Sequence, residues 1–354
     1  MSVYITEAYR TPVGIKDGIM KNVSAAELAS PVIKKLFNGL SSTPDEVILG
    51  NVTGPGGNIA RLSSLMAGLP VTVPGLTIDR QCSSGLEAIR LGAALIQSGE
   101  ADTVIAGGCE SSSTSPRPQK AIFSPDHIGD PEMGMAAEWL AEREHISRAE
   151  QDEYAIRSYR HYYESVEHGL FHREIVPIRD IHEDEASMKK RSIEKLASRA
   201  KTSFKSGGTV TAINSSSFND AACAVTLTSS AANGLKLVGS AVAGADPNFP
   251  AATPVPAIQR LLKRHGLTVG DIDLWEINEA FAVKILYTAR ELNIPINKIN
   301  IYGGGLALGH PYGASGAMLA LRLFYGMPEQ KAKYGVAAVG SAGGIGVAVL
   351  FEHV

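Results

Sequence analysis

Cysteine is scarce in this sequence, which has only Cys82, Cys109 and Cys223 among its 354 residues. Three widely spaced cysteines cannot build a disulfide framework or a cysteine-rich metal site, which favours a reducing compartment. No uninterrupted run of about 20 apolar residues occurs, so the sequence predicts no membrane span. The first 14 residues contain an acid and no long apolar stretch, unlike a signal peptide. We therefore expect a cytoplasmic protein.

An excess of charge of one sign is also absent. The formal net charge is −3 and 19% of the residues are charged, so the composition gives no reason to expect nucleic acid or an anionic membrane as partner. A hydrophobic content of 44% is ordinary for a globular protein. A chain of 354 residues exceeds what one hydrophobic core usually serves, so we expect two or three structural units.

The order of apolar patterns indicates an α/β fold. Valine-containing runs at 103–107 and 335–339 predict strands, and apolar periodicity at 25–36 and 256–265 predicts helices. Alternation of this kind along a chain is typical of helices packed on a sheet.

An internal repeat divides the chain into two halves. Three pairs of segments match in the same order and at nearly the same spacing: 45–51 with 272–278, 82–85 with 313–316, and 104–108 with 336–340. Such repetition indicates two units of the same architecture. We expect two similar α/β halves packed face to face, with helices that begin at Cys82 and Gly313 lying opposite each other.

The stretch from 116 to 207 differs from the two halves in its residue pattern. It contains charged amphipathic helical patterns between 132 and 169, and strand-like sequence returns at 208. Most of its charges are best interpreted as a solvated face. We interpret this stretch as an inserted helical lobe, which divides the chain into a first half at 1–115 completed by 208–233, a lobe at 116–207, and a second half at 234–354.

Cys82 lies where an extended apolar stretch, 71–78, turns into a buried helix. Free N–H groups at a helix N-terminus favour a thiolate, so we expect a lowered pKa for this thiol and a nucleophilic role. The alternative interpretation is a small core residue.

Asn278 and His310 are polar residues in apolar or glycine-rich surroundings. Asn278 and Glu279 stand between a hydrophobic strand and a hydrophobic helix, where an amide orients a water or caps the helix. His310 is surrounded by glycines between 303 and 316, and so constrained an imidazole is usually aimed at a partner. No other metal ligand lies at helical spacing from it, so we expect no metal site.

Eight short motifs follow one another in a characteristic order. They stand at 82–85, 107–111, 133–138, 147–152, 208–212, 219–220, 278–281 and 309–311. In this order and at these spacings they resemble the thiolase family, from Tyr4 to Glu352. The resemblance implies a thiolase-like five-layered α-β-α-β-α fold of two similar halves with an inserted loop lobe. It also implies an acyltransferase of lipid metabolism that acts on coenzyme A thioesters and needs no further cofactor.

The resemblance implies a role for each catalytic candidate. Cys82 would take the acyl group from a thioester, and His310 would be the base that activates it. His310 and a water held by Asn278 would stabilise the thioester enolate oxygen, and the backbone N–H of Cys82 would contribute to a second oxyanion hole.

The resemblance also implies where coenzyme A binds. The ligand would lie across the lobe, in contact with Met133, and its pantetheine arm would pass Ser216, Ala280 and Phe281. Ile213 stands where the family usually has glycine, which predicts a narrower tunnel.

A second departure from the family concerns its last motif, Cys-x-Gly. The matching residues are Gly340, Ser341 and Ala342. The family's cysteine at this place moves a proton to and from the acetyl carbon, and loss of such a group typically costs on the order of 100- to 10,000-fold in rate. A cysteine restored at position 340 would face Cys82, whereas Ser341 would face the opposite way. Cys109 is a candidate replacement, and Cys223 is expected in the core.

Three hypotheses about function stay open. The first is an acyltransferase that performs thiolysis or Claisen condensation. The second is an enzyme that forms an acyl-Cys82 for hydrolysis or decarboxylative condensation. The third is a non-catalytic coenzyme A-binding partner protein, against which the presence of Cys82, His310 and Asn278 argues.

The segment 112–132 bears on assembly. In tetrameric thiolases the corresponding segment carries an extra loop, and here it is shorter. Because closed two-fold pairs are the commonest assembly, we expect a homodimer.

Overall fold

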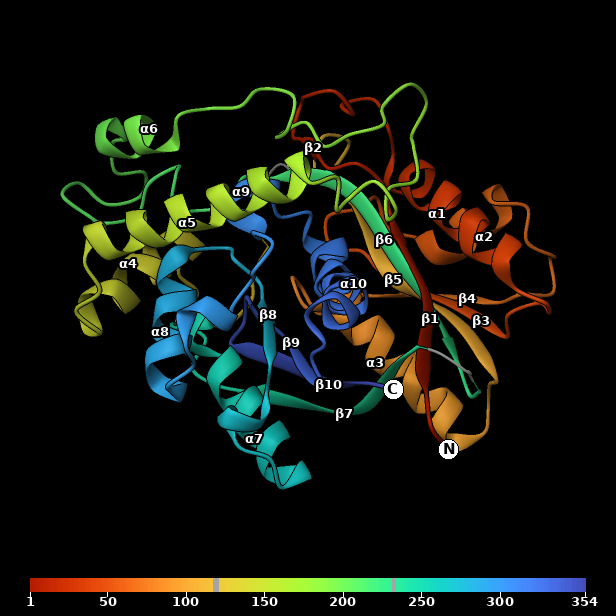
Figure 1. Ribbon diagram of the computed structural model, residues 1–354. Helices are drawn as coiled ribbons and strands as arrows, with labels where there is room; N and C mark the ends of the chain where they lie inside the picture. The colour runs from red at the N-terminus through yellow and green to blue at the C-terminus, as the bar shows by residue number, and fades with distance from the viewer. Residues whose placement is uncertain (117–120, 231–233) are drawn as a thin grey trace.

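The computed structural model describes residues 1–116, 121–230 and 234–354 (Figure 1). Residues 117–120 of the expected lobe and 231–233 of the expected first half lie outside the described residues. The strands are β1 (Tyr4–Arg10), β2 (Gly14–Ile15), β3 (Glu46–Gly50), β4 (Gly75–Ile78), β5 (Thr103–Ser111), β6 (Asn219–Thr228), β7 (Leu235–Gly244), β8 (Leu274–Ile277), β9 (Tyr334–Ser341) and β10 (Ile345–His353).

Ten α-helices and three 3-10 helices lie within the described ranges. The α-helices are α1 (Ala25–Gly39), α2 (Ile59–Met66), α3 (Ser84–Ser98), α4 (Met133–Arg143), α5 (Arg148–Glu167), α6 (Ile193–Arg199), α7 (Pro254–His265), α8 (Ala282–Leu292), α9 (Gly305–Leu308) and α10 (Tyr312–Gln330). The 3-10 helices are η1 (Pro250–Ala252), η2 (Val269–Asp271) and η3 (Ile296–Lys298). No helix of the described ranges is long and apolar enough to cross a membrane.

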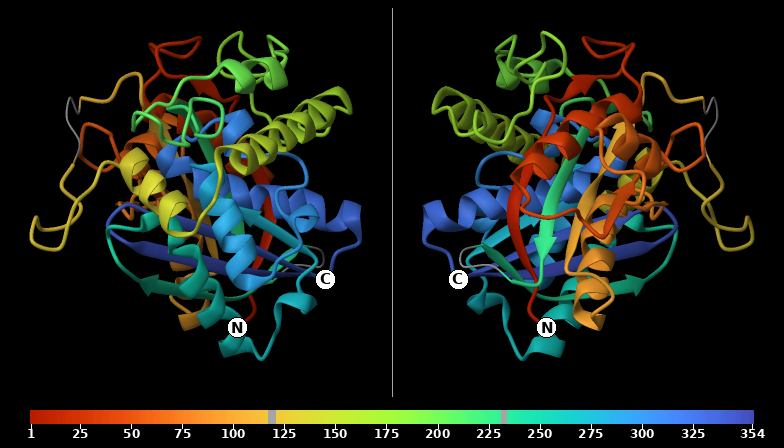
Figure 2. Two further views of the ribbon diagram at one scale, coloured as in Figure 1. Left: turned by 90° about the vertical axis from the view of Figure 1, so that its left-hand side faces the viewer. Right: turned by 90° about the vertical axis from the view of Figure 1, so that its right-hand side faces the viewer.

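The strands form one hydrogen-bonded path in the order β4-β3-β5-β6-β1-β7-β10-β9-β8, and β2 pairs with β6. The path bends where β1 meets β7, through the pairs Tyr4 with Lys236 and Ile5 with Leu235. Its two arms enclose α3 and α10, while α1 and α2 cover one outer face and α7 and α8 the other (Figures 1 and 2). This confirms the five-layered α/β fold.

Six strands are buried on both faces, which explains their continuous apolar sequences: β3, β5, β6, β8, β9 and β10. In β5, Ala106 packs against the central helices and Ile105 packs against the outer helix α1. In β9, Val339 faces the central layer and Ala338 faces the outer layer with α7 and α8. The parity of each position therefore decides which layer its side chain enters.

The central helices α3 and α10 lie side by side, as the repeat predicts. A Cβ on Gly85 would lie 2.6 Å from the carbonyl oxygen of Gly313, and one on Gly316 would lie 2.5 Å from the backbone nitrogen of Leu86. Only glycine allows the two backbones to approach this closely. The close packing brings the N-termini of both helices to one region of the molecule.

Candidate active site

Cys82 sits on a locked turn just before α3. Gln81 has a φ of 50°, a left-handed conformation that non-glycine residues rarely adopt. The Ser84 hydroxyl accepts from the backbone nitrogen of Arg80 at 2.8 Å and donates to the carbonyl of Gln81 at 2.6 Å. These two bonds hold the strained turn and present Cys82 to a cavity.

The expected lowering of the Cys82 pKa is wrong. Burial raises the pKa of Cys82 to about 11, and the charge of Lys284 lowers it by less. The lowering of the pKa by a helix N-terminus is smaller than its rise from the removal of the thiol from water. The thiol is therefore neutral at rest, and the thiolate has to arise during the reaction.

The His310 ring is fixed by its own backbone and by two polar side chains. Gly309 has a φ of 112°, and the backbone N–H of His310 donates to Asn219 Oδ1 at 3.0 Å. Nδ1 lies 2.6 Å from Ser315 Oγ and 3.3 Å from Asn278 Nδ2, whereas Nε2 has no partner among the described residues. Burial lowers the pKa of His310 to about 3, so the imidazole is neutral.

Asn278 lies behind His310 and is held by a buried lysine. Lys284 Nζ donates to Asn278 Oδ1 at 3.3 Å and to the carbonyl of Gly340 at 3.0 Å. Because an ammonium group only donates, the amide oxygen of Asn278 faces Lys284 and its nitrogen faces His310. When Nδ1 of His310 accepts from Asn278, the hydrogen of the neutral ring sits on Nε2; when Nδ1 instead donates to Ser315, Nε2 is free to accept a proton.

One cavity of about 470 Å³ brings most of the predicted site residues together. Its lining includes Cys82, His310, Met133, Ser216, Ala280 and Phe281. Asn278 is buried behind His310 and is not part of the lining. The sequence-based set thus forms one site with an apolar wall and a thiol and an imidazole opening into it.

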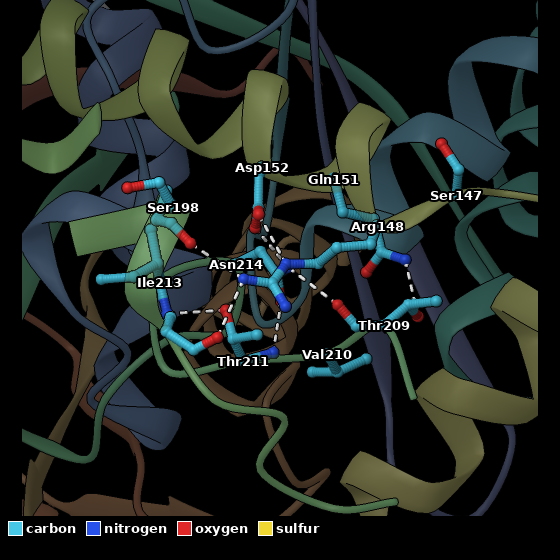
Figure 3. A network of polar contacts seen from close by, with 12 residues as sticks. Ser147, Arg148, Gln151, Asp152, Ser198, Thr209, Val210, Thr211, Ile213 and Asn214 are labelled. Atoms are coloured by element: carbon cyan, nitrogen blue, oxygen red, sulfur yellow. Dashed lines mark hydrogen bonds and ion pairs between the residues drawn. The ribbon is translucent and has the colours of Figure 1, made fainter. Parts of the chain in front are cut away.

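The inserted lobe positions one wall of this cavity. The backbone nitrogen of Ser216 donates to the carbonyl of Ala280 at 3.0 Å, and that of Ala282 donates to the carbonyl of Asn214 at 2.9 Å. The Asn214 side chain donates in turn to Asp152 on α5 at 2.8 Å (Figure 3). The two paired segments therefore form a short ladder anchored to the lobe.

The expected orientation of the last motif is wrong. A Cβ on Gly340 would lie 2.7 Å from both Thr253 Oγ1 and Pro254 Cδ, in the outer layer. Ser341 instead faces the central layer, where its Oγ lies 2.6 Å from Ser83 Oγ. Strand alternation puts neighbours on opposite faces, but only the tertiary packing decides which neighbour faces the nucleophile.

Cys109 and Ile213 also lie away from their expected places. Cys109 packs in the outer core with α1 and α2, on the opposite face of β5 from the central helices. Ile213 packs against the outer core of the second half and does not line the cavity, so it does not narrow it. Cys223 is in the central core, as expected. Burial raises the pKa of both Cys109 and Cys223.

Two residues of the site were not found from the sequence. Lys284 is the third residue of the apolar helix that follows Phe281. A charged residue in so apolar a segment is a sequence signal for a functional role. Glu110 accepts from the backbone nitrogens of Thr53 and Gly313 at 3.1 Å each, but its neighbours in sequence gave no sign of these contacts. No group of three or more potential metal ligands occurs within the described ranges.

The chain belongs to the thiolase family, and it is a thiolase-type acyltransferase. The family model described as "Thiolase, N-terminal domain" matches residues 3–231, and "Thiolase, C-terminal domain" matches 232–353. "Putative acetyl-CoA C-acetyltransferase YhfS" of Bacillus subtilis (strain 168) is 53% identical, and the match covers 99% of both chains. "Putative acetyl-CoA C-acetyltransferase VraB" of Staphylococcus aureus (strain COL) is 40% identical over 99% of this chain and 98% of its own.

Solved structures agree with this assignment. The Bacillus anthracis acetyl-CoA acetyltransferase has a TM-score of 0.92 and 37% identity, over 100% of this chain and 99% of its own. Human mitochondrial 3-ketoacyl-CoA thiolase in complex with CoA has a TM-score of 0.91 and 34% identity, over 100% of this chain and 98% of its own.

Proposed function

We propose that the protein transfers acyl groups between coenzyme A thioesters through an acyl-Cys82 intermediate, with acetyl-CoA as the donor. The observation that carries this proposal is the opening of Cys82 and His310 into one cavity, where His310 Nε2 has no hydrogen-bond partner in the described part of the chain. The names of the relatives, which are acetyl-CoA C-acetyltransferases and a thiolase bound to CoA, support the choice of substrate.

The acylation step exchanges one thioester for another. A bond forms between Cys82 Sγ and the acyl carbon, the bond to the coenzyme A sulfur breaks, and the proton of Cys82 ends on the released thiol. His310 accepts that proton on Nε2 when Nδ1 carries the hydrogen and donates to Ser315, and the 2.6 Å contact permits this tautomer. In the other tautomer, held by Asn278, Nε2–H is a donor for a thioester oxygen.

Coenzyme A would enter along the ladder that forms the cavity wall. Ala280 and Phe281 supply apolar surface for the pantetheine arm, and Ser216 supplies a hydroxyl beside it. Met133 begins α4 on the lobe side of the same cavity. No cofactor other than the thioester is part of this proposal.

A second candidate is acyl-Cys82 chemistry without carbon–carbon bond formation, such as hydrolysis. The observation that favours it is the position of the other thiols, because Cys109 and Cys223 are buried away from the cavity and Gly340 carries none. Neither of these two thiols can then act as the base that takes a proton from the acetyl carbon.

Two measurements on the same protein test these candidates. After incubation with acetyl-CoA, peptide mass spectrometry should show an acetyl group on the Cys82 peptide and none on the Cys109 or Cys223 peptides. Cys82→Ala removes the adduct, and Cys109→Ala is the matched control that keeps it. Equal labelling of the three peptides would contradict the proposal. Cleavage of acetoacetyl-CoA by coenzyme A then distinguishes the two candidates.

The protein is further proposed to be a cytoplasmic homodimer of lipid metabolism. Exposed apolar side chains gather on α2 and around the edge strand β4: Leu62, Leu65, Met66, Val71 and Leu76. An apolar patch beside an unpaired strand edge is suited to cover by a second copy through a two-fold axis. Light scattering at micromolar concentration should give a mass of two chains, and a mass of four would refute the homodimer.

A further inference from the structure

Lys284 is a buried cation in the first turn of α8, with 1% of its surface exposed. Within the described ranges it forms no ion pair with a carboxylate, and its two bonds go to the neutral oxygens of Asn278 and Gly340. Lysine is almost never fully buried without a counter-charge, because transfer of a charge out of water is unfavourable. The first turn of a helix is also an unfavourable place for a positive charge.

This cation lies one layer behind the nucleophile. Gly340, which accepts from Lys284, is followed by Ser341, whose hydroxyl bonds Ser83 directly after Cys82. The charge of Lys284 lowers the pKa of Cys82 and also that of His310. It is therefore coupled both to the thiol and to the imidazole of the site.

The other ionisable groups around Cys82 oppose a negative charge or are neutral. The carboxylates of Glu110 and Asp79 raise the pKa of Cys82. His310 is neutral because burial lowers its pKa, and Tyr312 is neutral because burial raises its pKa. Of the ionisable groups that act on the thiol, only the cation of α8 favours the thiolate, and the backbone N–H of Cys82 adds a smaller effect of the same sign on its pKa.

We propose that Lys284 is a positioning residue for the acyl transfer proposed above, on which this inference rests. Its ammonium group is the counter-charge for the negative charge that arises at Cys82, and its bond to Asn278 keeps the amide nitrogen directed at His310. Before reaction the cation has only neutral hydrogen-bond partners among the described residues, and during reaction it gains an anionic one. An interaction that strengthens as charge develops lowers the barrier rather than only improving binding.

The effect has a defined pH window. Burial lowers the pKa of Lys284 to about 8, while the neighbouring Cys82 raises it by less. The counter-charge is therefore present below pH 8 and is lost as the pH rises above 8. Any advantage that it gives to the thiolate should be largest near neutrality.

Two neutral variants separate the charge from the hydrogen bonds. Lys284→Gln removes the charge and keeps an amide that donates to neighbouring carbonyl oxygens. Lys284→Met removes both, and an apolar chain of similar length suits the buried site. Lys298→Gln is the matched control, because Lys298 donates to the carbonyl of Ile272 at 3.0 Å outside the site.

The readout is the rate at which iodoacetamide alkylates Cys82, followed on its peptide. At pH 7 both Lys284 variants should react about tenfold more slowly than the wild type, because a rise of one pKa unit lowers the thiolate fraction tenfold. At pH 9.5 the three rates should agree within about twofold. The control should match the wild type at both values.

Equal rates for wild type and Lys284→Gln at pH 7, or the same ratio at both pH values, would overturn the inference. A merely structural lysine would lower the melting temperature of its variants and leave the alkylation rates unchanged. The assay uses no acetyl-CoA, so its outcome is independent of the acetylation test. A wild type that is alkylated as expected but never acetylated would refute the proposed function alone.

Discussion

The equivalent strands β3 and β8 of the two halves are each followed by an asparagine, but the asparagines bind groups of opposite charge. In the first half, Asn51 after β3 donates through its amide to the carboxylate of Glu110 at 3.2 Å. In the second half, Asn278 after β8 directs its amide at His310 and accepts from Lys284. In the first half, the strand thus ends beside the carboxylate of Glu110, which accepts several hydrogen bonds. In the second half, the equivalent strand ends beside Lys284, a cation that has no carboxylate partner among the residues the structure describes.

The difference indicates that the group around Glu110 stabilises the fold, whereas the group around Lys284 serves the reaction. Glu110 accepts from the backbone nitrogens of Val52, Thr53 and Gly313 at 3.1 Å each, so it joins the first half to the start of α10. Buried donors of this kind are satisfied, which favours rigidity. The second half retains groups that are satisfied only when a ligand or a new charge arrives, which is typical of a reactive site.

The largest effect that we expect is on stability, from Glu110→Ala. The change leaves several buried N–H groups without an acceptor, so urea unfolding should show a loss of about 3–5 kcal/mol. Glu142→Ala is the control, because water screens the exposed Glu142–Lys205 pair and its loss should leave the urea unfolding curve nearly unchanged. A loss for Glu110→Ala as small as that of the control would remove the distinction between the two groups.

An intermediate effect is expected from Gly340→Cys. A side chain there meets the ring of Pro254 in the outer layer, so stability should fall by about 2 kcal/mol and thiolysis of acetoacetyl-CoA should not rise. Gly244→Cys on β7 is the control, since a Cβ there has no neighbour within 4 Å and the change should cost about 0.5 kcal/mol or less. A tenfold gain in thiolysis with unchanged stability would show that position 340 does face Cys82.

The smallest effect is expected from Lys284→Met, and it has the opposite sign. The folded-state pKa of Lys284, about 8, lies below the ordinary 10.5, so the unfolded chain binds the extra proton. The lysine therefore destabilises the fold fully below pH 8, and less as the pH rises toward 10.5. Its removal should raise the unfolding free energy by about 1–2 kcal/mol at pH 7, and by less at pH 10.

Lys298→Met is the control for this change, and urea unfolding at the two pH values is the measurement. The half-buried Lys298 should show no gain at either pH, because it is not enclosed by the site. A fall in stability for Lys284→Met at pH 7 would mean that the cation already has a stabilising partner in the resting protein.

Local signals predicted the fold and the reactive pair, because their causes are local. Cys82 was found from a strand that turns into a helix, and His310 from the glycines around it. Lys284 was missed, because its partner Gly340 lies 56 positions away and its burial depends on the packing of α8. For the same reason the pKa of Cys82 was expected to fall: a helix terminus is visible in a sequence, whereas desolvation by remote residues is not.

The short ladder at the cavity wall has a consequence for how the lobe can vary between relatives. The exposed loop before α6 can gain or lose residues without disturbing the site, because loop insertions at a surface are well tolerated. Helix α5 lacks this freedom, because its Asp152 holds Asn214. The last residues before β6 also lack this freedom. One residue inserted next to Asn214 would shift the hydrogen-bond partners of Ala280 and Ala282 by one position, and would turn Ser216 and its neighbours to the other side of the wall. Differences in chain length between relatives should therefore accumulate in the exposed loops of the lobe and be absent from residue 214 onward to β6.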